Sequence, residues 1–407
     1  MQTIMSVVGA VALLGIAYLL SDNRSAINRR TVATAFAVQA AIAGFILFVP
    51  QGSSMLDVVV RGVQHVIDYG NDGINFVFGA ETRQTLGFTI ALNVLPVVVF
   101  FAALMSVLYY FGVMQWVIAI IGGWLHRLLK TSHTESMTAV SNIFVGHTEA
   151  PLVVRPYLEK MTQSELFAVM TCGCATIAGA VMAAYASIGV DLKYLITASF
   201  MAAPGGLLMA KMLMPETDFR HDQFDPDETG GVEKPVNIFD AIGSGAATGL
   251  TLALNIGAML LAFVAIIGLF NGLLSGIGGW FGYGDITLQG MLGVLFAPIA
   301  FLIGVPWNEA MQAGSLIGQK IIVTEFYAYL NFVEIKDTMS AHSQLVVTFA
   351  LCGFANLSSI AILLGGLGSI APSRRQDVAR LGLRAVIGGT LSNLMSASLA
   401  GFFFSLQ

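Results

Sequence analysis

Two stretches of the chain decide its fold: SNIFVGHTEAPLVVRPYL (141–158) and GQKIIVTEFYAYLNF (318–332). Each places a threonine and a glutamate side by side inside a short apolar segment, with Glu149 in the first stretch and Glu325 in the second. A carboxylate among apolar residues is costly to bury and needs a polar partner or pathway. The two stretches therefore indicate where a polar site forms.

A second motif follows each of them. The first stretch leads into TCGCATIAGA (171–180) and the second into LCGFANLSSIAI (351–362), and both carry Cys-Gly-x-Ala. The cysteine comes 23 residues after the glutamate in the first copy and 27 residues after it in the second. The same order of motifs in two places predicts an internal repeat.

The composition predicts a polytopic membrane protein. Of 407 residues, 56% are hydrophobic and only 11% are charged, whereas soluble proteins are about one-quarter charged. Because a soluble surface needs those charges, the composition excludes an ordinary cytosolic enzyme and a disordered chain. A net charge of −5 argues against nucleic acid as a partner. The expected partner is the lipid bilayer.

Eight segments contain the roughly 20 apolar residues that a helix needs to cross a bilayer. They are 1–20, 31–50, 88–121, 165–190, 192–213, 242–275, 345–370 and 383–406. With both termini outside, 14 of the 19 Lys and Arg residues fall in cytoplasmic segments and four in outer segments. Positive charge concentrates on the cytoplasmic side of membrane proteins, so we expect the N- and C-termini to lie outside.

Three other segments are not expected to span. The acidic stretch within 215–238 is predicted to be a solvated linker. Residues 53–72 alternate apolar and charged side chains at helical spacing, which is typical of a helix that lies along the outer interface. Residues 286–305 are apolar, but a ninth span would place the basic residues near 374–384 outside. We expect them to form an interfacial or half-inserted helix.

The repeat itself predicts two re-entrant hairpins. From 135 to 159 the chain is apolar except around the Gly-His-Thr-Glu-Ala-Pro break at 146–151. The order of spans brings the first copy in from the cytoplasm and the second from outside, which is the inverted repeat of secondary transporters. Irregular backbone at half depth is tolerated only against protein or a water-filled cavity. We therefore expect both glutamates to face such a cavity.

The two glutamates have a structural alternative, an ion pair with Lys320 or Arg155. Neutral hydrogen-bonding side chains at matching places in both copies favour a substrate pathway instead. These are Asn142, His147, Thr148, Thr176, Thr324, Asn356, Ser358 and Ser359. Carboxylates with hydroxyls and amides suit a neutral, polyhydroxylated substrate, since an anion would call for more central cations than one lysine.

Enzyme and channel alternatives find less support in the sequence. The chain has no His-Glu-x-x-His motif, and no apolar segment offers a converging Ser, His and Asp. A channel would favour a repeated ring of like residues, whereas here two different hairpins meet within one chain. We expect a transporter and not an enzyme.

At these residues the chain resembles the concentrative nucleoside transporter family. The similar pieces are GHTEAPLVV, ATIAGAVMAAYA, GFANLSSIAI and GQKIIVTEFYAYL, the last against the family's G-x-K-x-x-x-N-E-F-x-A-Y. The resemblance implies an all-α polytopic membrane protein with eight transmembrane helices and two opposed re-entrant hairpins. It also implies an inverted repeat, an elevator-type transporter and a homotrimer. Such proteins import nucleosides, such as uridine or adenosine, across the bacterial inner membrane with a cation and without an organic cofactor.

The resemblance also implies which residues act. The nucleobase would meet His147, Thr148 and Glu149, while the ribose would be held by Glu325, Asn356 and Ser359, with Phe354 beside it. A co-transported sodium ion would be bound around Asn142, Val145, Ala175, Thr176 and Ile177. Ala175 stands where a serine hydroxyl is expected, and proton-coupled relatives differ at Asn142, so proton coupling remains the alternative. His147 replaces the family's glutamine and Thr324 its asparagine.

The predicted organisation follows from these assignments. It comprises N-terminal scaffold helices with the outer interfacial helix, a first repeat, the polar cytoplasmic linker, one scaffold helix and a second repeat. Their boundaries are 1–121, 122–214, 215–238, 239–285 and 286–407, in that order.

Overall fold

The computed structural model describes residues 2–218, 235–280 and 286–407, and every regular element in these ranges is a helix. The first half contains α1 (Gln2–Leu19), η1 (Arg24–Ala26), α2 (Arg29–Leu47), α3 (Pro50–Phe78), α4 (Ala80–Leu86), α5 (Ile90–Asn93), α6 (Leu95–Tyr110), α7 (Val113–Leu129), α8 (His133–Ser141), η2 (Ala150–Tyr157), α9 (Gln163–Ala175), α10 (Gly179–Ser187) and α11 (Leu192–Leu213). The second half contains α12 (Ile238–Gly279), α13 (Leu288–Leu302), α14 (Trp307–Ile322), α15 (Glu325–Ile335), η3 (Lys336–Thr338), α16 (Ala341–Leu351), α17 (Ser358–Ile370), η4 (Pro372–Arg374) and α18 (Arg375–Phe404).

Most predicted spans are confirmed. Within the described ranges, seven helical stretches are long and apolar enough to cross a membrane. They are Gln2–Leu19, Arg29–Leu47, Ile90–Tyr110, Gln163–Ser187, Leu192–Leu213, Ile238–Gly279 and Pro372–Phe404. The eighth predicted span, 345–370, consists of two shorter apolar helices, α16 and α17, with an irregular segment at 352–357 between them.

The predicted span 88–121 is wrong at its C-terminal end. The helix ends at Tyr110, and α7 begins at Val113 as a separate element. Gly112 between them has a φ of 76°, a left-handed conformation that glycine adopts without a steric penalty. Apolar residues continue through this turn, so hydropathy alone merged the two helices. The proposed domain boundary at 121 consequently falls inside α7.

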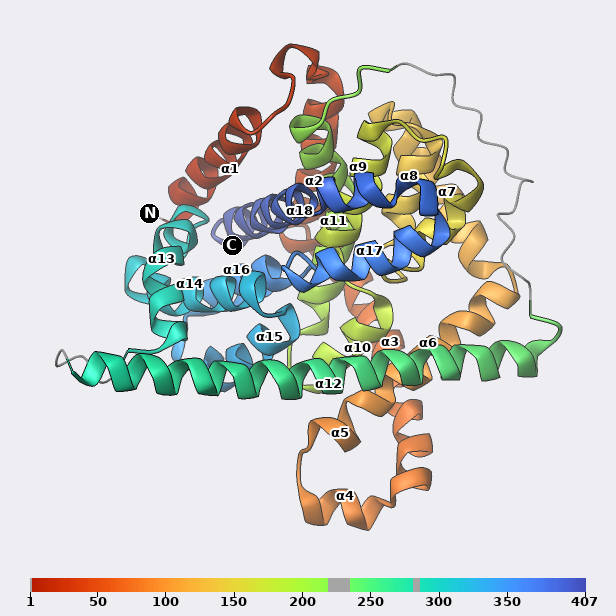
Figure 1. Cartoon of the computed structure of the whole chain (residues 1–407), viewed down its shortest axis with the longest axis vertical. Helices are drawn as coiled ribbons and strands as arrows, with labels where there is room; N and C mark the ends of the chain where they lie inside the picture. The colour runs from red at the N-terminus through yellow and green to blue at the C-terminus, as the bar shows by residue number, and fades with distance from the viewer. Residues whose placement is uncertain (1, 219–234, 281–285) are drawn as a thin grey trace.

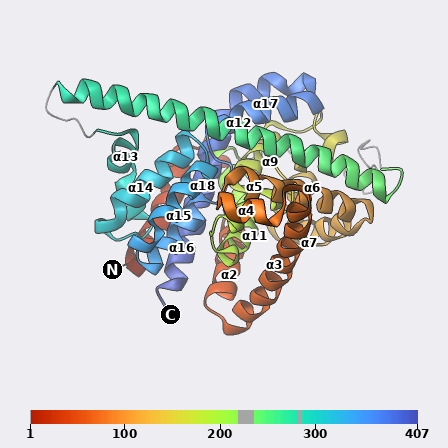
Figure 2. The same cartoon turned by 90° about the horizontal axis from the view of Figure 1, so that it is seen from below.

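Helix α12 is longer than the predicted 242–275. Its 42 residues extend about 63 Å at 1.5 Å per residue, roughly twice the ~30 Å of the hydrocarbon core. Figures 1 and 2 show it along the outside of the molecule, and only 11% of its most apolar part is buried. Gly245 and Gly249 let it approach α6 closely, because an added Cβ would lie 2.8 Å from the Cα of Ala103 and of Val99, respectively.

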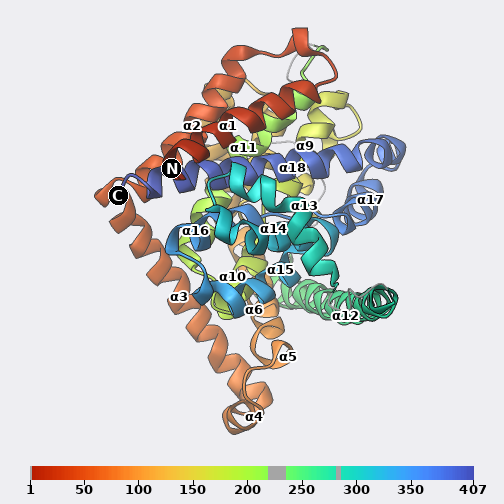
Figure 3. The same cartoon turned by 90° about the vertical axis from the view of Figure 1, so that its left-hand side faces the viewer.

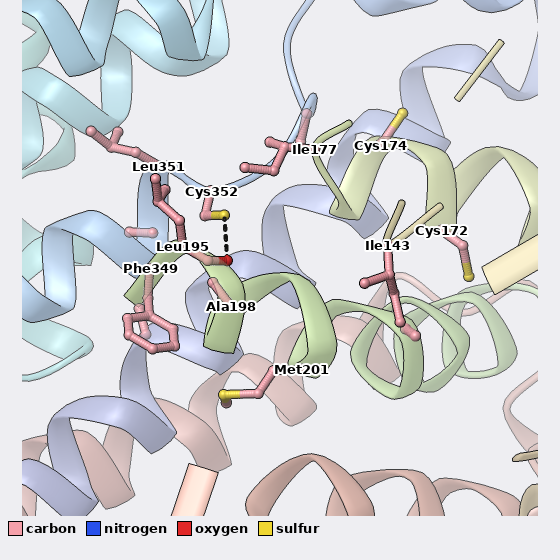
Figure 4. Close-up of a cluster of buried hydrophobic side chains, with 14 of the residues drawn as sticks. Ile143, Cys172, Cys174, Ile177, Leu195, Ala198, Met201, Phe349, Leu351 and Cys352 are labelled. Carbon is pink, nitrogen blue, oxygen red and sulfur yellow. Dashed lines mark hydrogen bonds between the residues drawn. The ribbon is translucent and has the colours of Figure 1, made fainter. Parts of the chain in front are cut away.

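Helices α9, α11 and α18 form the centre of the molecule (Figure 3). Around α9 and α11, 89% and 94% of the apolar stretch is buried, against 78% for α18. The termini lie near each other, and the Ser405 hydroxyl donates to Thr3 Oγ1 at 2.8 Å. The three cysteines are free and buried, and Figure 4 shows the Cys352 thiol directed at the Leu195 carbonyl. A single packed core therefore holds segments from both repeats.

Two of the three predicted non-spanning segments contain helices. Residues 53–72 lie within α3, which projects with α4 and α5 beyond the body in Figure 1. Residues 286–305 include α13, which is bent by 116° from α14 and packs against it. The linker 215–238 lies mostly outside the described residues, as do 281–285 at the end of the predicted scaffold segment 239–285.

Candidate functional site

The first hairpin consists of α8, an irregular tip and the 3₁₀ helix η2. Helix α8 begins with a capping box in which the Ser132 side chain and the Glu135 side chain each accept a backbone N–H of the other. It ends at Ser141, and Glu149 is the N-cap residue of η2. Pro151 occupies the first turn of η2, where its missing N–H has no intrahelical partner to lose. The tip is therefore the predicted break at 146–151.

The second hairpin consists of α14 and α15, with the tip at residues 323–324. The Thr324 hydroxyl accepts the N–H of Tyr327 at 3.3 Å and so caps α15. Threonine thus serves as an N-cap residue where the family pattern has asparagine. Glu325 is the first residue of α15, directly at the tip.

Each hairpin is joined to the broken helix that follows it. The Gly179 N–H, at the start of α10, donates to the Phe144 carbonyl of the first hairpin at 3.0 Å. The Leu357 N–H, before α17, donates to the Ile321 carbonyl of the second hairpin at the same distance. The two breaks also contact each other, since the Phe354 N–H donates to the Thr176 carbonyl at 3.0 Å. The repeat is thus reproduced in the backbone hydrogen bonds.

A cavity of 1720 Å³ lies between the two tips. Both Thr-Glu pairs line it, together with His147 and the polar residues of the second break. The structure therefore brings together the two acidic tips, as the repeated motif predicts. The cavity extends to Arg127, His133 and Pro235, at the end that the charge pattern assigns to the cytoplasm.

Glu325 is buried and held by two donors. The Tyr185 hydroxyl donates to its Oε1 at 2.9 Å, and Asn356 Nδ2 donates to its Oε2 at 2.7 Å. The Asn356 amide is itself oriented, because its Oδ1 accepts the N–H of Ser359 at 2.9 Å and the hydroxyl of Ser358 at 2.6 Å. The carboxylate at the second tip consequently has a fixed position.

The first tip is more open. Glu149 is partly exposed to the cavity, and no side chain of the described residues donates a hydrogen bond to its carboxylate. His147 is buried, and neither of its ring nitrogens has a hydrogen-bond partner among the described residues. Its ring meets the Phe354 ring edge-on at 5.0 Å between centroids. Gly173 on α9 makes room for this tip, because an added Cβ would lie 2.7 Å from His147 Cβ.

The predicted cation ligands lie on the first hairpin and at the break that follows α9, two segments that the Gly179–Phe144 hydrogen bond joins. Asn142 is fully buried, and its Nδ2 donates to the Thr138 carbonyl at 2.9 Å. Its Oδ1 has no hydrogen-bond partner in the part of the chain that the structure describes. A buried acceptor without a donor is costly, and an oxygen ligand for a hard cation would satisfy it. The Thr176 hydroxyl donates to the Cys172 carbonyl at 3.0 Å and keeps its lone pairs free.

The other three predicted ligands are also buried: Val145, Ala175 and Ile177. The Ala175 carbonyl already accepts Asn393 Nδ2 at 2.6 Å. The donor set therefore includes one unpaired amide oxygen and one hydroxyl, both of them neutral, which fits a monovalent cation better than a site for a multivalent metal.

Some residues of the site were not found from the sequence. Tyr185 reaches Glu325 across 140 positions of the chain, and no local pattern indicates that contact. A stripe on α12 lines the opposite wall of the cavity: Ser244, Thr248, Thr251 and Asn255. Its spacing of four, three and four residues on an otherwise apolar helix is a signal that could have predicted this wall.

Two opposed re-entrant hairpins, each followed by a broken helix around a polar cavity, define the class of secondary membrane carriers. Comparisons with known proteins identify the branch of this class. Residues 194–401 match the family described as Na+ dependent nucleoside transporter C-terminus, residues 8–81 match its N-terminus, and residues 91–191 match the model described as nucleoside recognition. The chain belongs to the Na+ dependent nucleoside transporter family.

Relatives are similar over the whole chain. An uncharacterized transporter of Haemophilus influenzae is 56% identical, covering 100% of this chain and 99% of its own length. The nucleoside permease NupC of Helicobacter pylori is 48% identical with the same coverage. The human solute carrier family 28 member 3 is 36% identical over 99% of this chain, which spans 60% of that longer protein.

Solved structures confirm the fold. CNTnw in an inward-facing substrate-bound state matches with a TM-score of 0.96 and 54% identity, covering 100% of this chain and 99% of that one. A CNTnw variant in an outward-facing state matches with a TM-score of 0.97 and 53% identity. The chain is therefore a multi-pass nucleoside transporter and not an enzyme, as the sequence predicts.

Proposed function

We propose that the protein imports nucleosides by symport with sodium across the bacterial inner membrane. The observation that carries this proposal is the pairing of two features in one region of the fold. Glu325 presents a carboxylate held by two donors, and Asn142 presents a buried amide oxygen without a donor. The first suits the hydroxyls of a ribose and the second suits a hard cation.

The nucleoside is held between the tips. The ribose hydroxyls donate to Glu325, whose geometry Tyr185 and Asn356 support, and Ser359 lies beside it in the same cavity. The base lies toward the first tip, where His147, Thr148 and Glu149 offer donors and acceptors. Phe354 lines the cavity between the two groups and packs against the nucleoside.

Sodium is bound by oxygen atoms of four residues: Asn142, Val145, Thr176 and Ile177. Ala175 contributes less to the site, because its carbonyl already accepts a hydrogen bond from Asn393. The ion would coordinate Asn142 Oδ1, which has no hydrogen-bond partner among the described residues, and would hold the first hairpin against α9. Since His147 is on the same tip, ion binding would order the groups that meet the base. Proton coupling is the alternative, and it would leave the Asn142 oxygen without a partner.

The solved relative supports these assignments. CNTnw was captured in outward-facing and intermediate states through variants at an asparagine, a glutamate and a phenylalanine. Asn142, Glu325 and Phe354 have these residue types in the same order along this chain. We infer an elevator-type cycle in which the two hairpins and their broken helices move together against α12 and its neighbours.

The assembly and orientation are parts of the same proposal. Helix α12 leaves most of its apolar surface exposed in the single chain, which suits a homotrimer in lipid. The domain division at 122–214 and 286–407 gives each moving half one hairpin and one broken helix. The charge pattern supports termini on the outer side.

The test is uptake of labelled uridine or adenosine by proteoliposomes that contain the purified protein. We expect concentrative, saturable uptake under an inward sodium gradient and a loss of concentration when choline replaces sodium. Uptake that follows an imposed pH gradient equally well in choline would show proton coupling. Absence of nucleoside uptake under both gradients would contradict the transport proposal itself.

The sodium site has its own test in Asn142→Ala. Removing the amide oxygen should raise the sodium concentration for half-maximal uptake about tenfold, which corresponds to about 1.4 kcal/mol. At saturating sodium, nucleoside binding should stay near the wild-type value, since the substrate groups are intact. An unchanged sodium dependence would place the ion elsewhere.

A further inference from the structure

Lys320, in the last turn of α14, is a buried cation that the transport site does not use. Only 1% of the residue is exposed, and no carboxylate of the described residues lies within ion-pair distance of its ammonium group. The ammonium donates instead to Asn393 Oδ1 at 2.6 Å and to the Ala350 carbonyl at 3.0 Å. Burying a charge without a counter-ion is expensive, so these neutral oxygens must compensate for it.

One of these oxygens comes from the end of a half-helix, and the other belongs to Asn393, an interior residue of α18 whose amide contacts the ends of two half-helices. Ala350 is in the last turn of α16, and Asn393 of α18 donates to the carbonyl of Cys352, at 2.8 Å, and to that of Ala175, at 2.6 Å. Ala175 is the last residue of α9. Helix C-termini carry partial negative charge, so α9 and α16 together present a negative electrostatic potential at Asn393. Lys320 supplies the positive charge that this convergence requires.

The contact is built closely. A Cβ added to Gly353 would lie 2.3 Å from Asn393 Oδ1 and 2.7 Å from the Ala175 carbonyl oxygen. Only glycine at this position lets the break after α16 approach Asn393. The Cys-Gly-x-Ala motif of the second repeat therefore serves this polar cluster and not only helix packing.

The first helix of each hairpin carries a different polar group near its C-terminal end, and these groups are not aligned residues, because the Thr-Glu pairs match Lys320 with Phe144. Asn142 lies at the end of α8, two residues before the Phe144 carbonyl that accepts from the following broken helix. Lys320 lies at the end of α14, one residue before the Ile321 carbonyl that has the same role. The first position offers an unpaired oxygen, and the second offers an ammonium group.

We propose that Lys320 is a tethered cation, which supplies in the second repeat the positive charge that the transported ion supplies in the first. One repeat then binds its cation from solution, while the other carries it on a side chain. This proposal rests on the proposed sodium coupling and deepens it. It assigns a latent sodium site to Asn393 Oδ1 and the Ala350 carbonyl, which Lys320 fills.

A pair of substitutions tests the proposal. Lys320→Ala removes the ammonium and leaves room for an ion, whereas Lys320→Met removes the charge and fills the space. The first readout is the sodium dependence of the unfolding temperature of the purified protein in choline and sodium chloride of equal ionic strength. The second is the sodium dependence of uridine uptake.

We expect Lys320→Ala to be less stable than wild type in choline and to regain that stability in sodium. The sodium dependence of its uridine uptake should have a Hill coefficient near 2, whereas that of wild type should be about 1. Lys320→Met should lose stability in both salts. Lys336→Ala is the control, because the Lys336 ammonium also donates to a backbone carbonyl, that of Gly189, at 2.9 Å, but the residue is partly exposed. This variant should keep the sodium dependence of wild type.

The proposal is wrong if the unfolding temperature of Lys320→Ala depends on sodium no more than that of wild type. The proposal is also wrong if Lys320→Ala cannot be purified in folded form at any sodium concentration, because sodium should replace the lost charge. Recovery only at high sodium supports the proposal. If wild-type uptake ignores sodium, the coupling proposal fails, whereas the unfolding readout, which needs no transport, still decides the role of Lys320.

Discussion

The two hairpin tips carry the same Thr-Glu pair but treat the glutamate differently. Glu325 is buried and receives two side-chain hydrogen bonds, from Tyr185 and Asn356. Glu149 is partly exposed in the same cavity and receives none from the side chains of the described residues. One internal repeat has thus produced a rigid acceptor at one tip and an accessible one at the other.

The difference suggests that the two tips bind different parts of the substrate. An acceptor already fixed by its neighbours loses little entropy on binding, so the second tip suits the ribose, which all nucleosides share. The first tip, with an open carboxylate and an unpaired histidine, can meet bases with different patterns of donors and acceptors. Substitutions at the second tip should therefore affect every substrate, and those at the first tip should discriminate between substrates.

The largest effect is expected for Glu325→Gln. The glutamine keeps the shape but loses the charge that strengthens both existing hydrogen bonds and those of the ribose. Charge-assisted hydrogen bonds contribute about 1.5–3 kcal/mol each, so uptake of uridine and adenosine should fall at least about 100-fold. The variant should still elute as a folded, detergent-soluble protein. Normal uptake would contradict the ribose assignment.

Glu149→Gln should have a smaller effect that depends on the substrate. With no side-chain donors of the described residues to lose, the change removes mainly the charge that the base meets, at about 1.4 kcal/mol or about tenfold in uptake. Competition of unlabelled uridine and adenosine against a labelled tracer measures the dependence on the base. If uptake of all nucleosides fell equally, and by as much as in Glu325→Gln, the two tips would be equivalent and the proposed difference between them would be wrong.

Tyr185→Phe tests whether the second tip is held in place by its donors. The hydroxyl gives one hydrogen bond to a charged group, so its loss should weaken nucleoside affinity by about 1.5 kcal/mol, or about tenfold. Because Tyr185 is a supporting residue, both uridine and adenosine should be affected equally.

Tyr329→Phe is the matched control for that substitution. Tyr329 is equally buried and packs against Tyr185, but its hydroxyl donates to the Thr348 carbonyl at 2.7 Å. It should cost stability and leave the affinity for nucleosides unchanged. A loss of affinity as large as that of Tyr185→Phe would indicate a packing effect in place of the hydrogen bond.

The smallest effect is expected for His147→Gln, which restores the family's usual residue. Neutral histidine and glutamine both offer a donor and an acceptor, so uptake at neutral pH should change by less than about threefold. A shift in the preference between uridine and adenosine is the informative outcome, measured by the same competition. Complete loss of uptake would mean that the histidine ring, with its contact to Phe354, is essential to the site.

The sequence predicted the acidic tips because two features recur together: a carboxylate in an apolar segment and a Cys-Gly motif after it. Local chemistry of this kind is visible in a single chain. The partners of Glu325 were less accessible, since Tyr185 reaches it only through tertiary packing of α10 against α15. The role of Asn393 could not be predicted for the same reason, because it depends on where three helices converge.

Helix boundaries show a related limit. Hydropathy located seven spanning stretches, but it carried 88–121 through the turn at Gly112, where apolar residues continue without interruption. It also shortened α12, whose apolar run is longer than a bilayer is thick. In both cases the apolar composition does not mark the boundary, because the first break is a backbone turn among apolar residues and α12 continues beyond the length that a bilayer requires.

The most direct measurement is equilibrium binding of uridine to the purified protein in sodium chloride and in choline chloride. If the ion behind the first tip orders the groups that meet the nucleoside, sodium should tighten uridine binding about tenfold or more, and uridine should tighten sodium binding by the same factor. Equal uridine affinity in the two salts, in a protein that binds uridine, would contradict the account.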